Sequence, residues 1–169
     1  MIVYHITGSD QELTLADAVL RLMAAHRQLG RSKPESGGQL FGRVHNQHVE
    51  VLDATGPRRR DARTRFSFRP DRAAERREIQ RMHRQGLSYL GDWHTHPEQL
   101  PQPSLMDLRS IAETACQSRY TLGPLILIVV GLAPPPAGLY VCLHSGLSLH
   151  RLEPSAVVAS AAGVMNGKS

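Results

Sequence analysis

Two histidines, a serine and an aspartate in the second half of the chain have a spacing that suits metal chemistry. His94 and His96 stand two residues apart, and Ser104 and Asp107 follow after Pro97. On a β-strand, side chains two positions apart point to the same face, so the two imidazoles would converge on one point. A short loop would then lead into a helix whose first turn holds Asp107. Two imidazoles and one carboxylate suit a zinc ion with an open fourth position, and zinc lowers the pKa of water there to about 7.

The complete spacing is far more specific than its parts. In a chain of this composition a His-x-His pair is expected about 0.5 times by chance, whereas the pair with Ser104 and Asp107 in place is expected roughly 0.0015 times. A structural interpretation is compatible with the metal site, because Ser104 can cap a helix and Asp107 can complete a capping box. Asp92 lies on the same predicted strand face and is an alternative ligand, although a solvated or supporting carboxylate is the simpler interpretation.

Hydrophobic periodicity and capping signals predict the elements that must position these residues. The histidine pair falls in a strand over residues 87–96, and Asp107 falls in a helix over residues 104–117. Thr14 and Asp17 are predicted to cap the first helix. Because several strands follow one another without helices between them, we expect one α+β domain with a largely antiparallel or mixed sheet. The other predicted strands cover residues 2–6, 39–44, 48–54, 65–69, 124–132, 138–144 and 147–152, and the other helices cover 14–29 and 70–85.

Length and composition limit the classes of function. The 169 residues, 41% of them apolar, are enough for a single core. The longest apolar stretch, residues 125–133, is too short for a membrane span, which needs about 20 residues. Residues 1–5 do not resemble a secretory signal, and Cys116 and Cys142 form no Cys-x-x-Cys pair. We therefore expect a reduced, cytoplasmic protein with no membrane partner.

Positive charge is concentrated in residues 57–86. This segment holds eleven of the eighteen arginines and four acidic residues, which gives it a net charge of +7. A solvated helix face with a preceding loop is the simplest interpretation, and an acidic protein partner is the alternative. We do not expect nucleic acid to bind there, because the arginine-rich runs 57–64 and 70–86 hold no Phe, Tyr or Trp for base stacking.

The residues quoted above resemble the full signature of the JAMM (JAB1/MPN/Mov34) metalloproteases. An upstream segment, Glu35-Ser36-Gly37-Gly38-Gln39-Leu40-Phe41-Gly42, is similar to the glutamate and glycine-containing strand of that family. The resemblance implies an MPN/JAB1 fold related to the cytidine deaminases, with a curved mixed sheet packed between helices. It also implies a zinc isopeptidase that cleaves after the C-terminal glycine of ubiquitin or a ubiquitin-like protein. The catalytic domain would span residues 1–153, and residues 154–169 would form a flexible tail.

The family resemblance also implies a role for each site residue. His94, His96 and Asp107 would bind zinc, and Glu35 would move a proton from the attacking water to the leaving amine. Without the family, Glu98 beside the histidines would compete equally with Glu35 for that role. Ser104 would donate a hydrogen bond to the oxyanion, and its alternative role is the helix cap alone.

The narrower resemblance is to bacterial peptidases of anti-phage CBASS operons. In those systems the JAMM enzyme removes conjugates that an E1/E2-like enzyme makes on the cyclic-nucleotide synthase (CD-NTase). The expected partners are therefore a ubiquitin-like modifier or its conjugated target, and the sequence sets no oligomeric state. Two alternatives stay open at this point: processing of a ubiquitin-like sulfur-carrier protein, and a non-catalytic binding module of the MPN type. Deamination is not expected, because Cys116 lacks the Pro-Cys-x-x-Cys pattern.

Overall fold

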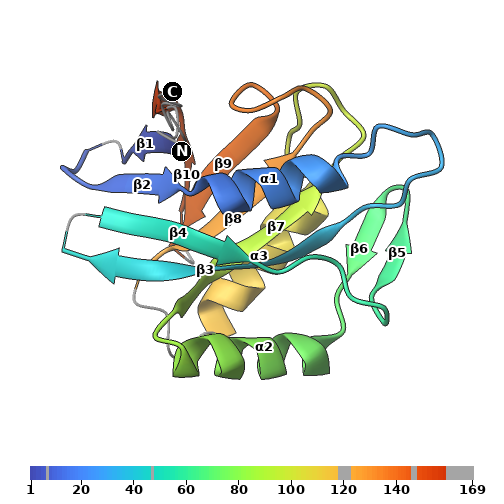
Figure 1. Ribbon diagram of the computed structural model, residues 1–169, viewed down its shortest axis with the longest axis horizontal. Coiled ribbons are helices and arrows are strands. Elements are labelled where there is room, and N and C mark those ends of the chain that lie inside the picture. Colours follow the sequence, from blue (N-terminus) through green and yellow to red (C-terminus); the bar gives the residue numbers. More distant parts are fainter. Residues whose placement is uncertain (7, 47, 118–122, 146–147, 159–169) are drawn as a thin grey trace, which may run out of the picture.

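The computed structural model describes residues 1–6, 8–46, 48–117, 123–145 and 148–158. Within this part of the chain, nine strands form one mixed sheet in the order β10-β9-β8-β7-β3-β4-β2-β1-β11, and β5 and β6 form a separate hairpin (Figure 1). The pairs β2–β4 and β7–β8 are parallel, and the other neighbours are antiparallel. The strands are β1 (Ile2–His5), β2 (Glu12–Leu15), β3 (Gly37–His45), β4 (His48–Ala54), β5 (Ala62–Thr64), β6 (Ser67–Arg69), β7 (Ser88–Thr95), β8 (Leu125–Val130), β9 (Leu139–His144), β10 (Leu149–Leu152) and β11 (Pro154–Val157).

Helices cover both faces of the sheet. They are α1 (Asp17–His26), α2 (Arg72–Arg84) and α3 (Leu105–Gln117), and Figure 1 shows α1 in front of the sheet, α3 behind it and α2 at the bottom of the molecule. The central strand β8 is buried throughout, and its residues alternate between two cores. Residues 126, 128 and 130 pack in the cluster that holds Val19 and Met23 of α1, while residues 125, 127 and 129 pack with Ile111 of α3. The α+β class and the mixed sheet between helices are therefore confirmed.

The predicted first helix begins too early. Residues 12–15 form β2, which pairs with β1 on one side and β4 on the other, and α1 starts only at Asp17. Thr14 lies in that strand, so it does not cap α1, whose N-cap is Ala16 without a side-chain hydrogen bond. Leu13 and Leu15 are fully buried two residues apart, which is a strand pattern that overlaps the helical spacing of the residues after it.

Two other boundaries also differ from the sequence prediction. Residues 65–69, predicted as one strand, contain the turn at residues 65–66 and only β6, and the partner strand β5 was not predicted. Residues 154–157, assigned to a flexible tail, form β11 and pair with β1, so the sheet extends beyond the predicted domain end. The rest of that tail, from residue 159, lies outside the described residues.

None of the described helices has the length and apolar content needed to cross a membrane. Cys116 is exposed and Cys142 is buried, and both are free thiols. The remaining predicted strands and helices correspond to elements of the structure within a few residues.

Candidate metal centre

A bulge in β7 determines which of its side chains reach the site. Leu90 is an extra residue in the pairing of β7 with β3. Gly91 beside it has a φ of 143°, and an added Cβ would lie 1.9 Å from the carbonyl oxygen of Ile126, so only glycine fits there. Because of the bulge, Trp93 joins Leu90 in the core on the α1 side. His94, the next residue, then faces the opposite side, where α3 lies.

The start of α3 presents the carboxylate of Asp107 to the histidines. The backbone N–H of Ser104 donates to Asp107 Oδ2 at 2.7 Å, and the N–H of Asp107 donates back to Ser104 Oγ at 3.2 Å. This reciprocal capping box fixes the first turn of the helix. The structural interpretation of Ser104 and Asp107 is therefore correct, and it holds Asp107 beside the histidine pair.

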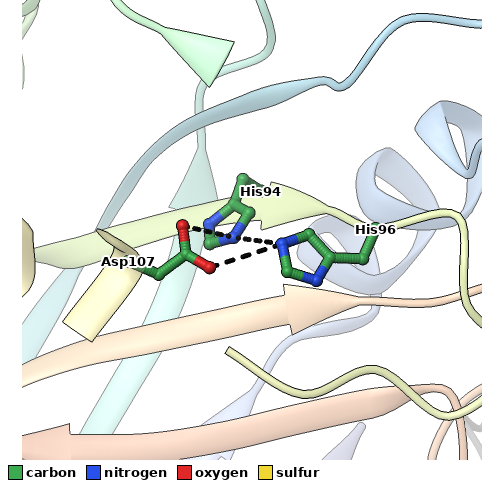
Figure 2. Close-up of side chains that lie close together, drawn as sticks. All are labelled: His94, His96 and Asp107. Atoms are coloured by element: carbon green, nitrogen blue, oxygen red, sulfur yellow. Dashed lines mark hydrogen bonds and ion pairs between the residues drawn. The ribbon is translucent and has the colours of Figure 1, made fainter. Parts of the chain in front are cut away.

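The three predicted ligands converge on one point (Figure 2). The Nε2 atoms of His94 and His96 are 3.1 Å apart, and they lie 3.3 Å and 3.4 Å from the two carboxylate oxygens of Asp107. Ligands of a tetrahedral zinc ion at about 2.05 Å must stand about 3.3 Å from one another. The donor set and its spacing therefore fit a zinc ion bound by three protein ligands.

The charges at the site are tightly coupled. Burial alone would raise the pKa of Asp107, but hydrogen bonds from His94 and His96 hold it well below its usual range. Burial would lower the pKa of His96, and the hydrogen bond and charge of Asp107 raise it instead. Asp107 is thus a permanent anion, which is the state that a metal ligand requires.

Glu35 lies beside this cluster, immediately before β3. Its side chain is 5% exposed, and its Oε1 stands 3.9 Å from His96 Nε2. Burial raises the pKa of Glu35 to about 7, with His96 opposing the rise and Asp107 adding to it. Glu98 also lines the cleft, but it is exposed and accepts a hydrogen bond from the backbone of Gln102 at 3.4 Å. Of the two candidate bases, Glu35 is the buried one beside the histidines, and a pKa of about 7 suits proton transfer near neutral pH.

Asp92 lies on the site side of β7 but outside the ligand cluster. The half-buried carboxyl is hydrogen-bonded to Tyr89, and burial and the nearby Glu75 raise its pKa to about 7. Among the described residues, the group of side chains able to hold a metal comprises His94, His96 and Asp107 without it. The interpretation of Asp92 as a supporting residue is therefore favoured.

A buried hydrogen-bond network, absent from the sequence prediction, holds the segment that carries Glu35. Arg63 of β5 donates its Nε to the Glu35 carbonyl at 2.5 Å and its Nη2 to Ser36 Oγ at 2.8 Å. The Ser36 N–H donates to Thr95 Oγ1 at 3.0 Å, and that hydroxyl donates to Gln28 Oε1 at 3.1 Å. Thr95 stands between the two histidines in sequence. This network therefore connects the segment of Glu35 to β7. No short spacing signals it, because its members come from four separate segments.

The site opens into a cleft of about 780 Å³. One wall is the β5–β6 hairpin, with Phe66 at its turn, and another is the first turn of α3, with Met106. Both side chains are more than 70% exposed, at 73% and 77%. The cleft therefore joins these two exposed side chains to the three candidate ligands and Glu35.

Comparisons with known proteins point in the same direction. A family model described as prokaryotic homologs of the JAB domain matches residues 16–142. A protein named CD-NTase/cGAS isopeptidase from Escherichia coli (strain TW11681) is 28% identical over 129 residues, which cover 75% of this chain and 80% of that protein. A protein of the same name from Pseudomonas aeruginosa (strain BWHPSA011 / Pa011) is 35% identical over 124 residues, covering 70% and 77%. In fold, the chain is similar to the solution structure of protein DSY2949 from Desulfitobacterium hafniense, with a TM-score of 0.61, 21% identity and coverage of 82% and 88%.

Proposed function

Because the chain belongs to the family of prokaryotic homologs of the JAB domain, and is a JAMM-type metallopeptidase, we propose that it is a zinc-dependent isopeptidase. Its substrate would be a ubiquitin-like modifier joined through its C-terminal residue to a target protein. Relatives named CD-NTase/cGAS isopeptidase suggest a conjugated CD-NTase of an anti-phage CBASS system as that target. The observation that carries the proposal is the convergence of three potential ligand side chains next to the buried Glu35.

His94, His96 and Asp107 would hold the zinc ion. When bound, zinc supplies a Lewis acid that polarises the scissile carbonyl and acidifies water. The protein's own contribution is to keep Asp107 ionised and both imidazole Nε2 atoms directed at one point.

Glu35 would act as the proton carrier of the hydrolysis. Its carboxylate accepts a proton from water as the water oxygen bonds to the carbonyl carbon. The carboxylic acid then returns that proton to the target's amino nitrogen as the C–N bond breaks. A group with a pKa of about 7 can perform both transfers near neutral pH.

Ser104 would stabilise the oxyanion that forms during the attack. Its Oγ accepts a hydrogen bond from the Asp107 N–H, which leaves the hydroxyl hydrogen able to donate. A single donor of this kind is worth roughly 2.7–4 kcal/mol of transition-state stabilisation. Capping and oxyanion binding therefore use different parts of the same hydroxyl group.

The proposal is tested by incubating the zinc-loaded protein with a purified modifier–CD-NTase conjugate and weighing the products by mass spectrometry. We expect release of the intact modifier with a free C-terminal carboxylate and of the target with a free amine. Glu35→Gln should lower the rate about 100- to 10,000-fold, while Glu98→Gln serves as the matched control. Full activity of Glu35→Gln, or no cleavage by the zinc-loaded wild type, would overturn the proposal.

The two alternative functions, a non-catalytic binding module and a sulfur-carrier processing peptidase, are less well supported. A non-catalytic binding module has no need of a complete ligand cluster, and this chain keeps all three ligands close together. For processing of a sulfur-carrier protein, no observation favours that substrate over a conjugate. The same assay with a sulfur carrier bearing a C-terminal extension separates the two activities.

A further inference from the structure

Four arginines share the outer side of α2. We call its exposed residues Arg76, Arg77, Arg81 and Arg84 the arginine face. At about 100° per residue, they occupy an arc of roughly 140° on the helix surface. That arc is centred opposite the buried side of the helix, which carries Glu75 and Met82. Figure 1 shows α2 at the lower edge of the molecule, with its outer side away from the sheet.

Most acidic residues of the same segment are engaged elsewhere, although the charge of Arg77 acts on Asp71. Glu78 pairs with Arg58, and Glu75 pairs with Arg72 at 2.9 Å. Asp61 accepts from the backbone N–H groups of Arg58 and Asp71, and Asp71 in turn caps α2. Among the described residues, no carboxylate lies within 4.0 Å of a guanidinium nitrogen of the arginine face. Four of the eleven arginines of residues 57–86 therefore lie together on the outside of one helix.

Folding alone does not account for the arginine face. Arg77 and Arg81 stand four residues apart, where like charges destabilise a helix by about 0.2–0.5 kcal/mol. Arg81 and Arg84, a further like-charge pair, are stabilised by the C-terminal end of the helix dipole. Because these contributions oppose each other and the side chains are exposed, replacing the arginines should have little effect on stability.

One end of the arginine face adjoins a residue that lines the cleft. Arg72, in the first turn of α2, lines the same cleft as His94 and Asp107. Arg76 of the arginine face is one turn further along and donates its Nε to the Arg72 carbonyl at 3.3 Å, and from there the face extends about 12 Å along the helix. A protein whose linkage lies in the cleft, and whose body extends past Arg72, would bring its own surface to these arginines.

We propose that the arginine face docks an acidic surface of the conjugated protein whose linkage enters the cleft. This inference rests on the proposed function. A protein partner is favoured over nucleic acid because α2 contains no Phe, Tyr or Trp on which bases could stack. Charges of opposite sign that face each other on two partners mainly raise the rate of association. Salt weakens this effect.

The test compares two triple variants that remove the same charge. Arg77→Gln/Arg81→Gln/Arg84→Gln removes most of the arginine face. The control, Arg21→Gln/Arg31→Gln/Arg43→Gln, removes three exposed arginines elsewhere. Binding of a fluorescent poly-glutamate of about 20 residues is measured by anisotropy at about 50 mM and about 500 mM NaCl. We expect the first variant to bind at least about tenfold more weakly than wild type at low salt, the control to change by less than about twofold, and high salt to abolish binding.

Equal losses in both variants, or no binding by the wild type at low salt, would overturn the inference. A single-stranded oligonucleotide of the same length is run in parallel. Tighter binding of that oligonucleotide, lost in the first variant, would assign the face to nucleic acid instead. The same proteins are then given the modifier–CD-NTase conjugate, for which we expect the first variant to lose at least about fivefold in kcat/KM at low salt. If the wild type cleaves no conjugate, the proposed function fails while the binding result still stands.

Discussion

Replacing Glu35 by glutamine should make the metal-free protein more stable while making the enzyme inactive. Glu35 is 5% exposed and burial raises its pKa to about 7, from 4.5 for an unburied glutamate. Its folded pKa exceeds the unfolded one, so the folded protein binds more protons between these values. The stability that this group contributes is therefore lost as pH rises from about 4.5 to 7, and above that range the buried carboxylate destabilises the fold.

The size of the effect follows from the two pKa values. A difference of 2.5 units, at 1.36 kcal/mol per unit, gives about 3 kcal/mol of destabilisation at pH 8 and about 1 kcal/mol at pH 5. Glutamine has nearly the same shape and no charge, so Glu35→Gln should recover most of this. In a chain of this size, about 3 kcal/mol corresponds to a rise in Tm of roughly 6–12 °C.

The assay is thermal or urea unfolding of chelator-treated protein at about pH 5 and pH 8, by circular dichroism. Glu98→Gln is the control, because it removes the same charge from an exposed position in the same cleft and should shift stability by less than about 0.5 kcal/mol. A Glu35→Gln protein that is less stable than wild type, or equally stabilised at both pH values, would refute the reasoning.

Three other perturbations test the site and its support. Asp107→Asn keeps an acceptor for the capping box but removes the charge, so the protein should still fold. Its zinc affinity, measured by competition titration, should fall at least about 100-fold, and unchanged affinity would exclude Asp107 as a ligand. Gly91→Ala should destabilise the protein by about 3 kcal/mol or more in urea unfolding, because its Cβ would meet the Ile126 carbonyl at 1.9 Å, and a loss below about 1 kcal/mol would contradict this. Arg63→Ala should lower kcat about 10-fold or more while zinc content and KM are retained, and Arg59→Ala is the control. A change in KM alone would show that Arg63 does not position Glu35.

The convergence of the three candidate ligands could be predicted because their geometry is local. His94 and His96 depend only on the period of a strand, and Asp107 only on the capping signal of a helix that follows a short loop. Each of these rules operates over a few residues. The structure then needed only to bring one strand end and one helix start together, which the sheet and α3 do.

The support of Glu35 could not be predicted, because its partners are distant in sequence. The partners come from three separate segments: Arg63 from the β5–β6 hairpin, Thr95 from β7, and Gln28 from the segment after α1. Only the fold brings them together. The β2 strand was missed for a related reason. Its four residues are decided by pairing with β1 and β4, which outweighs the helical spacing that continues into α1.

The position of the bound metal tests the central claim most directly. Crystals grown with one equivalent of zinc are measured at wavelengths on either side of the zinc absorption edge. We predict one anomalous peak at about 2.0–2.2 Å from the Nε2 atoms of His94 and His96 and from a carboxylate oxygen of Asp107. A peak elsewhere, or these three side chains without a shared ion, would contradict the account.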